Sequence, residues 1–270
     1  MDDGGVTIES PISTKLSGML LIYDHHEVRE IRLNRLPVNA LTTELLESLR
    51  GQIEQAAGEG SRAVILSGAP GRFSAGLDVP LLLKLGAAEI TSLWHALYAL
   101  LETIARSPIP IVAAITGHAP AGGTVLAMFC DWRVMAEGDF KIGLNEVQVG
   151  IPLPPVILGG LRRLVGARRA EQLGVSGALI SPQEALAVGL VDELAALDAV
   201  VQRAQERCVR MLALPSDAMN LTRQQARADL PRLFESGMDA ELKTVIANWW
   251  MPGTQETLKG LAVRLKKNTG

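Results

Sequence analysis

One carboxylate and two glycine-bearing turns are the parts of this sequence best suited to carry chemistry. Glu146 stands in an apolar stretch that includes Leu144 and Val149, and apolar neighbours raise the pKa of a carboxyl group toward the range of a general base. The turns are Phe-Ser-Ala-Gly-Leu-Asp at residues 73–78 and Pro-Ala-Gly-Gly-Thr at residues 120–124. Free backbone N–H groups in such turns can hold the anion that the base produces. Together these residues predict a site for proton abstraction.

The second turn, residues 120–124, comes after a buried-strand pattern and opens a short apolar helix pattern. The first N–H groups of a helix lack partners within it, the helix dipole there favours negative charge, and glycine lets a ligand approach the backbone. A tight turn in which glycine merely allows packing explains this segment equally well when it is considered alone. A dinucleotide-binding loop fits less well, because the segment lies in the middle of the chain and G-x-G-x-x-G is absent.

The other two features also have ordinary explanations. The first turn, residues 73–78, has small residues that would expose the N–H of Leu77, and Asp78 is suited to cap the segment after it, but alone this turn is weak evidence. Glu146 alone is better explained as an exposed loop acid or a helix-capping partner than as a catalytic base. The functional interpretation becomes the stronger one only when these features are considered with the rest of the chain.

Composition excludes several classes of protein. The 270 residues are 48% hydrophobic and 20% charged, with a mean hydropathy of +0.21, so a large folded core is expected and disorder is not. The net charge of −3 gives no electrostatic reason to bind nucleic acid. The longest apolar run, near residues 109–115, is too short to span a membrane, and residues 1–5 lack the features of a signal peptide, so a cytoplasmic protein is expected. The cysteines imply no disulfide framework, and the histidines imply no metal site.

Hydrophobic periodicity predicts an α/β core with helices after it. Expected strands cover residues 19–23, 28–33, 63–66, 111–115 and 132–136, and expected helices cover residues 44–57, 90–105 and 122–130. The alternation of strands and helices indicates an α/β domain at residues 1–195. Residues 196–270 show helical periodicity with proline breaks and no convincing strand, which predicts a helical C-terminal region.

An ordered series of short motifs, from about residue 20 to the C-terminus, resembles the enoyl-CoA hydratase/isomerase (crotonase) superfamily. The series comprises Leu-Asn-Arg-Leu-Pro-Val-Asn-Ala-Leu at residues 33–41, residues 73–78, Pro-Ile-Pro-Ile-Val-Ala-Ala-Ile at residues 108–115, Ala-Gly-Gly at residues 121–123, Cys-Asp-Trp-Arg at residues 130–133 and Ala-Leu-Ala-Val-Gly-Leu-Val-Asp at residues 185–192. The resemblance implies a spiral of ββα units with a helical C-terminal trimerisation region, and hence a homotrimer or a dimer of trimers. It also implies an acyl-CoA thioester substrate, with coenzyme A as part of that substrate and no separate cofactor.

By this resemblance, the backbone N–H groups of Leu77 and Gly122 form an oxyanion hole for the thioester oxygen. The substrate would also meet the first turn and two further positions, namely Phe73, Ser74, Ala75, Gly76, Val125 and Asn145. Hydratases of the superfamily carry one glutamate three residues after the position of Gly122 and a second at the position of Glu146. Here the first position is Val125, and Gly-Leu-Asn-Glu at residues 143–146 is similar to the segment found in mitochondrial-type Δ3,Δ2-enoyl-CoA isomerases.

The expected reaction is therefore the conversion of a 3-enoyl-CoA to a 2-trans-enoyl-CoA in unsaturated fatty acid degradation. Glu146 would take a proton from C2 and return it at C4, and Asn145 would contact the substrate or orient Glu146. Two alternatives stay open: another reaction of the superfamily, such as weak hydration, thioester hydrolysis or decarboxylation, and non-catalytic acyl-CoA binding. Arg35 is expected at an exposed surface, and His118 in a wall or hydrogen-bonding role near the second turn.

Overall fold

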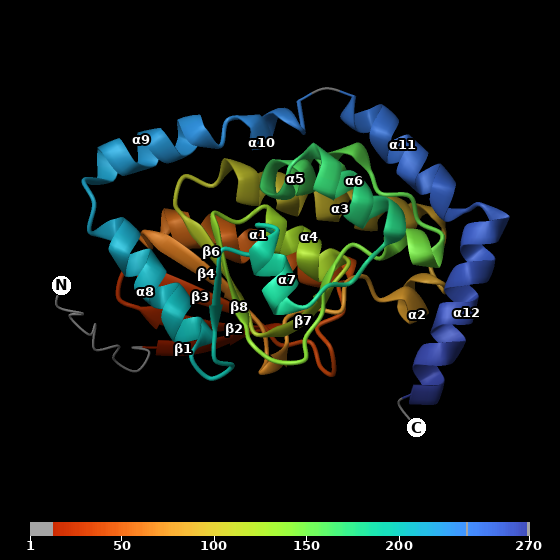
Figure 1. The fold of residues 1–270 in the computed structure, drawn as a ribbon, viewed down its shortest axis with the longest axis horizontal. Helices are drawn as coiled ribbons and strands as arrows, with labels where there is room; N and C mark the ends of the chain where they lie inside the picture. Colours follow the sequence, from red (N-terminus) through yellow and green to blue (C-terminus); the bar gives the residue numbers. More distant parts are fainter. Residues whose placement is uncertain (1–12, 236, 269–270) are drawn as a thin grey trace.

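A seven-stranded sheet runs through the middle of the molecule (Figure 1). The computed structural model describes residues 13–235 and 237–268; residues 1–5, on which the cytoplasmic prediction depends, lie outside these ranges. In order across the sheet, the strands are β1 Ser13–Ser17, β2 Leu20–His25, β3 Val28–Leu33, β4 Ala63–Ser67, β6 Ile111–Ile115, β8 Trp132–Ala136 and β10 Glu193–Ala195. The first three strands pair antiparallel, and each later neighbour pairs parallel.

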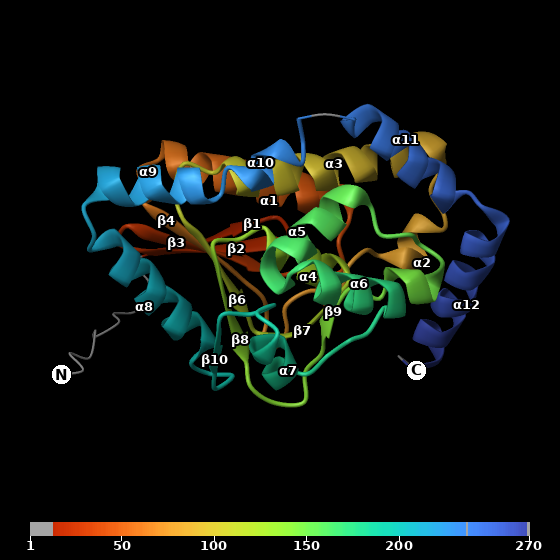
Figure 2. The same ribbon diagram turned by 45° about the horizontal axis from the view of Figure 1, so that its top comes forward.

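Both faces of this sheet are covered by helices. α1 (Thr43–Gly58) and α3 (Ala87–Arg106) contribute to the larger core cluster on one face, and α8 (Val200–Leu212) covers the other face. Figure 2 shows α1 and α3 along the top of the molecule and α8 at the lower left, on the other side of β3 and β4. Every residue of β4 and β6 is buried, which explains why these strands are continuous apolar runs in the sequence rather than alternating ones.

A second, three-stranded sheet is formed by β5 (Gly71–Arg72), β7 (Gly117–Pro120) and β9 (Ile142–Gly143). Each of these short strands comes next in the chain after a strand of the main sheet, and each is followed by helix. The chain thus repeats a strand–strand–helix unit, and the parallel pairing of equivalent strands stacks the repeats. The expected spiral of ββα units is confirmed.

The remaining helices connect the strands or follow the last of them in the C-terminal part of the chain. They are α2 Val79–Leu82, α4 Gly122–Met128, α5 Pro155–Val165, α6 Ala167–Ser176, α7 Pro182–Ala187, α9 Ser216–Ala226, α10 Asp229–Arg232, α11 Met238–Trp249 and α12 Pro252–Asn268, with a 3-10 turn, η1, at Glu146–Val149. None of the helices in the described residues is long and apolar enough to cross a membrane. A domain boundary at residue 195 and the trimer both stay predictions.

Observed elements lie close to the expected ones where the apolar spacing is regular. α1 begins at Thr43 because the side chain of Thr42 accepts the N–H of Leu45 at 3.3 Å, and its buried face includes Leu49 and Ile53. The helix expected at residues 122–130 is shorter and ends at Met128.

One buried carboxylate binds the C-terminal helices to the sheet. Asp131, directly before β8, accepts hydrogen bonds from Arg223 Nε at 2.6 Å and Arg223 Nη2 at 2.8 Å, and Arg227 Nη1 lies 3.1 Å from its Oδ1. The same arginines donate to the carbonyl oxygens of Ser107 and Phe129, each at 2.8 Å. Both arginines are buried, and Asp131 supplies the counter-charge that they share.

Replacing Asp131 by Asn should lower the free energy of unfolding by about 3–5 kcal/mol, because two buried guanidinium groups lose their counter-charge. Urea titration followed by circular dichroism measures this change. The matched control is Asp229→Asn, which removes the more exposed Asp229–Arg163 ion pair and should cost less than about 1 kcal/mol. Equal effects of the two substitutions would contradict the assignment.

Candidate active site

The first turn, residues 73–78, is held in place by the segment around Asn39. Asn39 Nδ2 donates to the Phe73 carbonyl at 3.0 Å, and Ser74 Oγ donates to the Asn39 carbonyl at 2.8 Å. Leu41 then binds both neighbours of Leu77: its N–H donates to Gly76 O at 2.7 Å, and its carbonyl accepts from Asp78 N at 3.0 Å. This pairing turns the N–H of Leu77 away from Leu41, and within the described residues that N–H has no acceptor.

The second turn depends on the backbone of Ala121. This residue has φ 49° and ψ −120°, a conformation that costs energy for any residue with a Cβ atom and that often marks a functional site. Its N–H donates to Gly143 O at 2.8 Å, which fixes the turn. α4 begins at the next residue, so the N–H of Gly122 has no partner within the helix. It also has no other acceptor in the parts of the chain that the structure describes.

The two turns touch through their backbones. A Cβ atom built on Gly76 would lie 2.9 Å from the amide nitrogen of Gly122, and one built on Gly122 would lie 3.1 Å from the Cα of Gly76. A Cβ atom on Gly123 would lie 2.5 Å from the carbonyl oxygen of Ser74. Only glycine fits at these positions without displacing backbone, and Gly76 also has φ +78°. The structure therefore brings the two predicted turns together.

Glu146 comes after β9 and begins η1. Its Oε2 atom is buried and has no hydrogen-bond partner among the described residues, and the same holds for Oδ1 of the preceding Asn145. Burial raises the pKa of Glu146 to about 7, because the ionised form loses hydration and gains no counter-charge. The raised pKa expected for this carboxyl group is confirmed. The alternative interpretation, an exposed acid in a loop, does not agree with the burial of Oε2.

The segment with Glu146 lies beside the second turn. β9 pairs with β7, and Gly143 stands opposite Pro120. On its other side, η1 packs against α12, where Thr254 Oγ1 donates to Gly150 O at 2.7 Å. α12 also packs against α2, the helix directly after the first turn. The C-terminal helix thus contacts both the segment after Leu77 and the segment with Glu146 (Figure 1).

The other predicted site residues differ in exposure. Phe73 and Ser74 are fully buried, and Ser74 Oγ also accepts the N–H of Gly76 at 3.2 Å, so its side chain supports the turn from within. Ala75 is exposed. Val125 is 1% exposed and belongs to the main core cluster. An apolar side chain therefore stands three residues after Gly122, and no second carboxylate is present at that position.

A groove of about 530 Å³ opens at the two turns. It is lined by Val38, Gly71, Arg72, Ala75, His118 and Pro120. His118 stands in the wall as expected, its Nδ1 accepts the N–H of Lys141 at 3.2 Å, and its ring packs edge-on against Phe140. Sequence reasoning missed Arg72, which is exposed at the groove. The expectation for Arg35 was wrong, because its side chain is 25% exposed and pairs with Asp78 at 2.6 Å.

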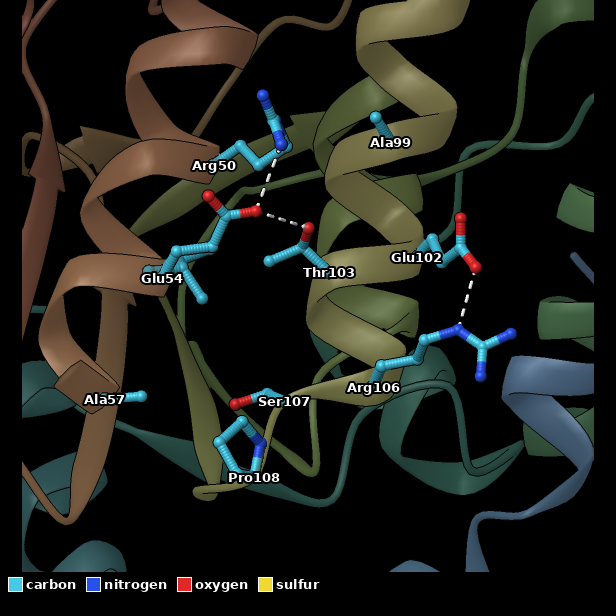
Figure 3. A pocket seen from close by; sticks show the side chains of 10 residues that line it. Arg50, Glu54, Ala57, Ala99, Glu102, Thr103, Arg106, Ser107 and Pro108 are labelled. Atoms are coloured by element: carbon cyan, nitrogen blue, oxygen red, sulfur yellow. Dashed lines mark hydrogen bonds and ion pairs between the residues drawn. The ribbon is translucent and has the colours of Figure 1, made fainter.

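A separate hollow of about 460 Å³ lies between α1 and α3 and does not contain any predicted site residue (Figure 3). Its charged side chains are already paired: Arg50 with Glu54 at 3.1 Å, and Arg106 with Glu102 at 2.7 Å. Such a surface offers no unpaired group for chemistry. In the described residues, moreover, no group of three or more His, Cys, Asp or Glu side chains could hold a metal ion.

Comparison with known proteins shows what this chain is similar to. Residues 24–251 match the enoyl-CoA hydratase/isomerase family. The chain is 33% identical over 246 residues to human mitochondrial enoyl-CoA delta isomerase 1, covering 90% of this chain and 82% of the relative. It is 35% identical over 204 residues to the probable enoyl-CoA hydratase echA17 of Mycobacterium avium, covering 75% and 77%. The crystal structure of human mitochondrial delta3-delta2-enoyl-CoA isomerase superimposes with a TM-score of 0.89 at 31% identity, covering 93% of this chain and all of that one.

The buried carboxylate predicts a stability effect that depends on pH. The pKa of Glu146 is raised to about 7 in the folded protein, against about 4.3 in an unfolded chain, so ionisation in the folded state costs about 4 kcal/mol. Because the folded pKa is the higher one, the native protein should lose this stability as pH rises through about 4 to 7.

Glu146→Gln should therefore be more stable than the native protein at pH 8, by about 3–4 kcal/mol, and equally stable at about pH 4. Urea titrations of both proteins at the two pH values give the comparison. An equal gain in the free energy of unfolding at both pH values would show that ionisation of Glu146 does not destabilise the folded protein.

Proposed function

This chain belongs to the enoyl-CoA hydratase/isomerase family, and on that premise we propose that it converts 3-enoyl-CoA thioesters to 2-trans-enoyl-CoA thioesters. The observation that carries this proposal is the combination of a buried carboxyl oxygen without a partner, Oε2 of Glu146, with two touching turns in which the N–H groups of Leu77 and Gly122 have no acceptor among the described residues. A base and an anion site are what the transfer of an allylic proton requires.

In this mechanism Glu146 acts as base and then as acid. Its ionised carboxylate takes a proton from C2 of the substrate, and the electron pair spreads over a dienolate whose negative charge rests on the thioester oxygen. The N–H groups of Leu77 and Gly122 donate to that oxygen. The protonated carboxyl group of Glu146 then delivers the proton to C4, which moves the double bond from C3–C4 to C2–C3. A pKa of about 7 suits both halves of the exchange, because the group is neither too weak a base nor too weak an acid.

Isomerisation is favoured over hydration by the residue at position 125. Adding water to a double bond requires a group that holds the water as well as one that moves its proton, and Val125 is apolar and buried. A single carboxylate suffices to move a proton between two carbon atoms of one substrate. The named relatives include both isomerases and probable hydratases at similar identity, so the argument rests on the side chains present in this chain.

The groove beside the turns is the proposed path of the coenzyme A portion of the substrate. Its lining includes Arg72 and His118, and a guanidinium suits a ligand that carries phosphate groups. We propose that Ala75 and Asn145 contact the substrate directly, that Phe73, Ser74 and Gly76 shape the turn beneath it, and that Val125 keeps the site dry. Coenzyme A is part of the substrate, and the proposed chemistry needs no separate cofactor.

Assembly, pathway and location are proposed on the same premise. A homotrimer or a dimer of trimers is supported by exposed apolar side chains in the C-terminal region, among them Leu221 on α9, Trp250 and Met251 between α11 and α12, and Val263 on α12. The proposed role is in the degradation of unsaturated fatty acids. The proposed location is the cytoplasm.

Identification of products tests the reaction. Incubation with 3-enoyl-CoA and 2-enoyl-CoA thioesters of several chain lengths should yield the isomer from the former and little 3-hydroxyacyl-CoA from the latter. Faster hydration, thioester cleavage or decarboxylation would assign a rival reaction of the family. Binding of the thioesters without turnover would indicate a non-catalytic acyl-CoA-binding protein.

Glu146→Gln should lower kcat/KM for isomerisation by about 100- to 10,000-fold, the usual contribution of a general base. In the native protein, kcat/KM should rise with pH through about 7, as Glu146 ionises. Steady-state rates from pH 5 to 9 measure both effects. Glu47→Gln, an exposed substitution on α1, is the matched control and should leave the rate unchanged. A folded Glu146→Gln protein with the native rate would refute the mechanism.

A further inference from the structure

We infer that Thr124 is a positioning residue, which sets the distance between the base at Glu146 and the oxyanion donor at Gly122. This inference rests on the proposed function. Thr124 lies in the first turn of α4, two residues after Gly122, and is fully buried. Its side chain does not belong to the groove or to the anion site, so it acts through other residues rather than on the substrate.

The hydroxyl of Thr124 holds the peptide group of Gly143. Thr124 Oγ1 accepts the N–H of Gly143 at 2.8 Å, and its single proton can go to the carbonyl oxygen of Ala119 or to that of Gly143, which lies at 3.1 Å. The Gly143 carbonyl in turn accepts the N–H of Ala121 at 2.8 Å. Both ends of Gly143 are thus bound to the segment that presents the N–H of Gly122.

The opposite side of β9 is fixed as well. Ile142 exchanges two backbone hydrogen bonds with Ile180, at 3.1 and 2.9 Å. A Cβ atom on Gly143 would lie 2.4 Å from the carbonyl oxygen of Ala178, so the strand is in close contact there. β9 therefore has one position between Thr124 and residues 178–180, and Glu146 stands three residues after Gly143.

In this arrangement the position of β9 depends on the hydroxyl group of Thr124. A methyl group in its place cannot approach an amide nitrogen to 2.8 Å, because such contacts are optimal at about 3.5–4.0 Å. Thr124→Val would therefore push β9 outward by on the order of 1 Å, and a misplacement of that size typically costs about 100-fold in rate. Thr124→Ser keeps the oxygen and its hydrogen bonds, so β9 should stay in place.

Steady-state kinetics on 3-enoyl-CoA test the inference. Thr124→Val should lower kcat per folded molecule by about 10- to 100-fold and leave KM within about 3-fold, because the groove proposed for the coenzyme A portion is unchanged. Thr124→Ser should retain kcat within about 3-fold of the native value. A role in stability alone would lower only the folded fraction, which circular dichroism and thermal melting determine for each variant.

Ser67→Ala is the matched control, because it removes a buried hydroxyl that donates to Glu30 at 2.5 Å within the main sheet. It should lower the melting temperature without changing kcat per folded molecule. If Thr124→Val does not fold, Thr124→Ala serves instead: it does not push β9 outward, but it removes the hydrogen bonds that hold Gly143, so β9 loses its fixed position and kcat per folded molecule should also fall.

Native kcat per folded molecule in the variant without the hydroxyl, or equal losses in Thr124→Val and Thr124→Ser, would overturn the inference while leaving the proposed function intact. A native protein that does not isomerise 3-enoyl-CoA would instead overturn the proposed function, and the inference with it.

Discussion

The contact between the backbones of Gly76 and Gly122 is the constraint on which the rest of the site depends. The two donors beside it, at Leu77 and Gly122, belong to different repeats of the spiral, and a side chain at either glycine would separate them. Their approach requires that equivalent strands in both sheets pair in register. The large buried sheet thus determines, through its short companion strands, where two N–H groups point.

Glu146 contrasts with the other buried acids of this protein. Glu30 is 1% exposed and bonds to Ser67 at 2.5 Å and to Arg32 at 2.9 Å. Asp131 bonds to two arginines. The fold can therefore supply partners to a buried carboxylate where stability requires them, and Oε2 of Glu146 has none in the described residues. Its position costs folding free energy, which is expected of a group kept ready to exchange protons.

The sequence predicted those features that local pattern encodes. The strand expected at residues 28–33 has those limits in the structure, and the motifs that contain Leu77, Gly122 and Glu146 lie together. The two-residue strand β9 is too short to show a periodicity. The pairing of Asp131 with Arg223 joins residues far apart in the chain, and exposed Arg72 carries no pattern that separates it from other surface arginines. These features depend on tertiary packing, which a single sequence does not encode locally.

The proposed anion site is made of main-chain atoms, so at position 77 only an exchange to proline removes its donor. Other substitutions can alter these N–H donors only by changing the shape of the turns. The acidic side chains around them, in contrast, can each be replaced by a single substitution. Related proteins with this scaffold can therefore keep the proposed binding of the thioester oxygen while the reaction on the acyl chain changes. Percentage identity over the whole chain is therefore a poor guide to which reaction a member performs, and the acids that surround the two amides are a better one.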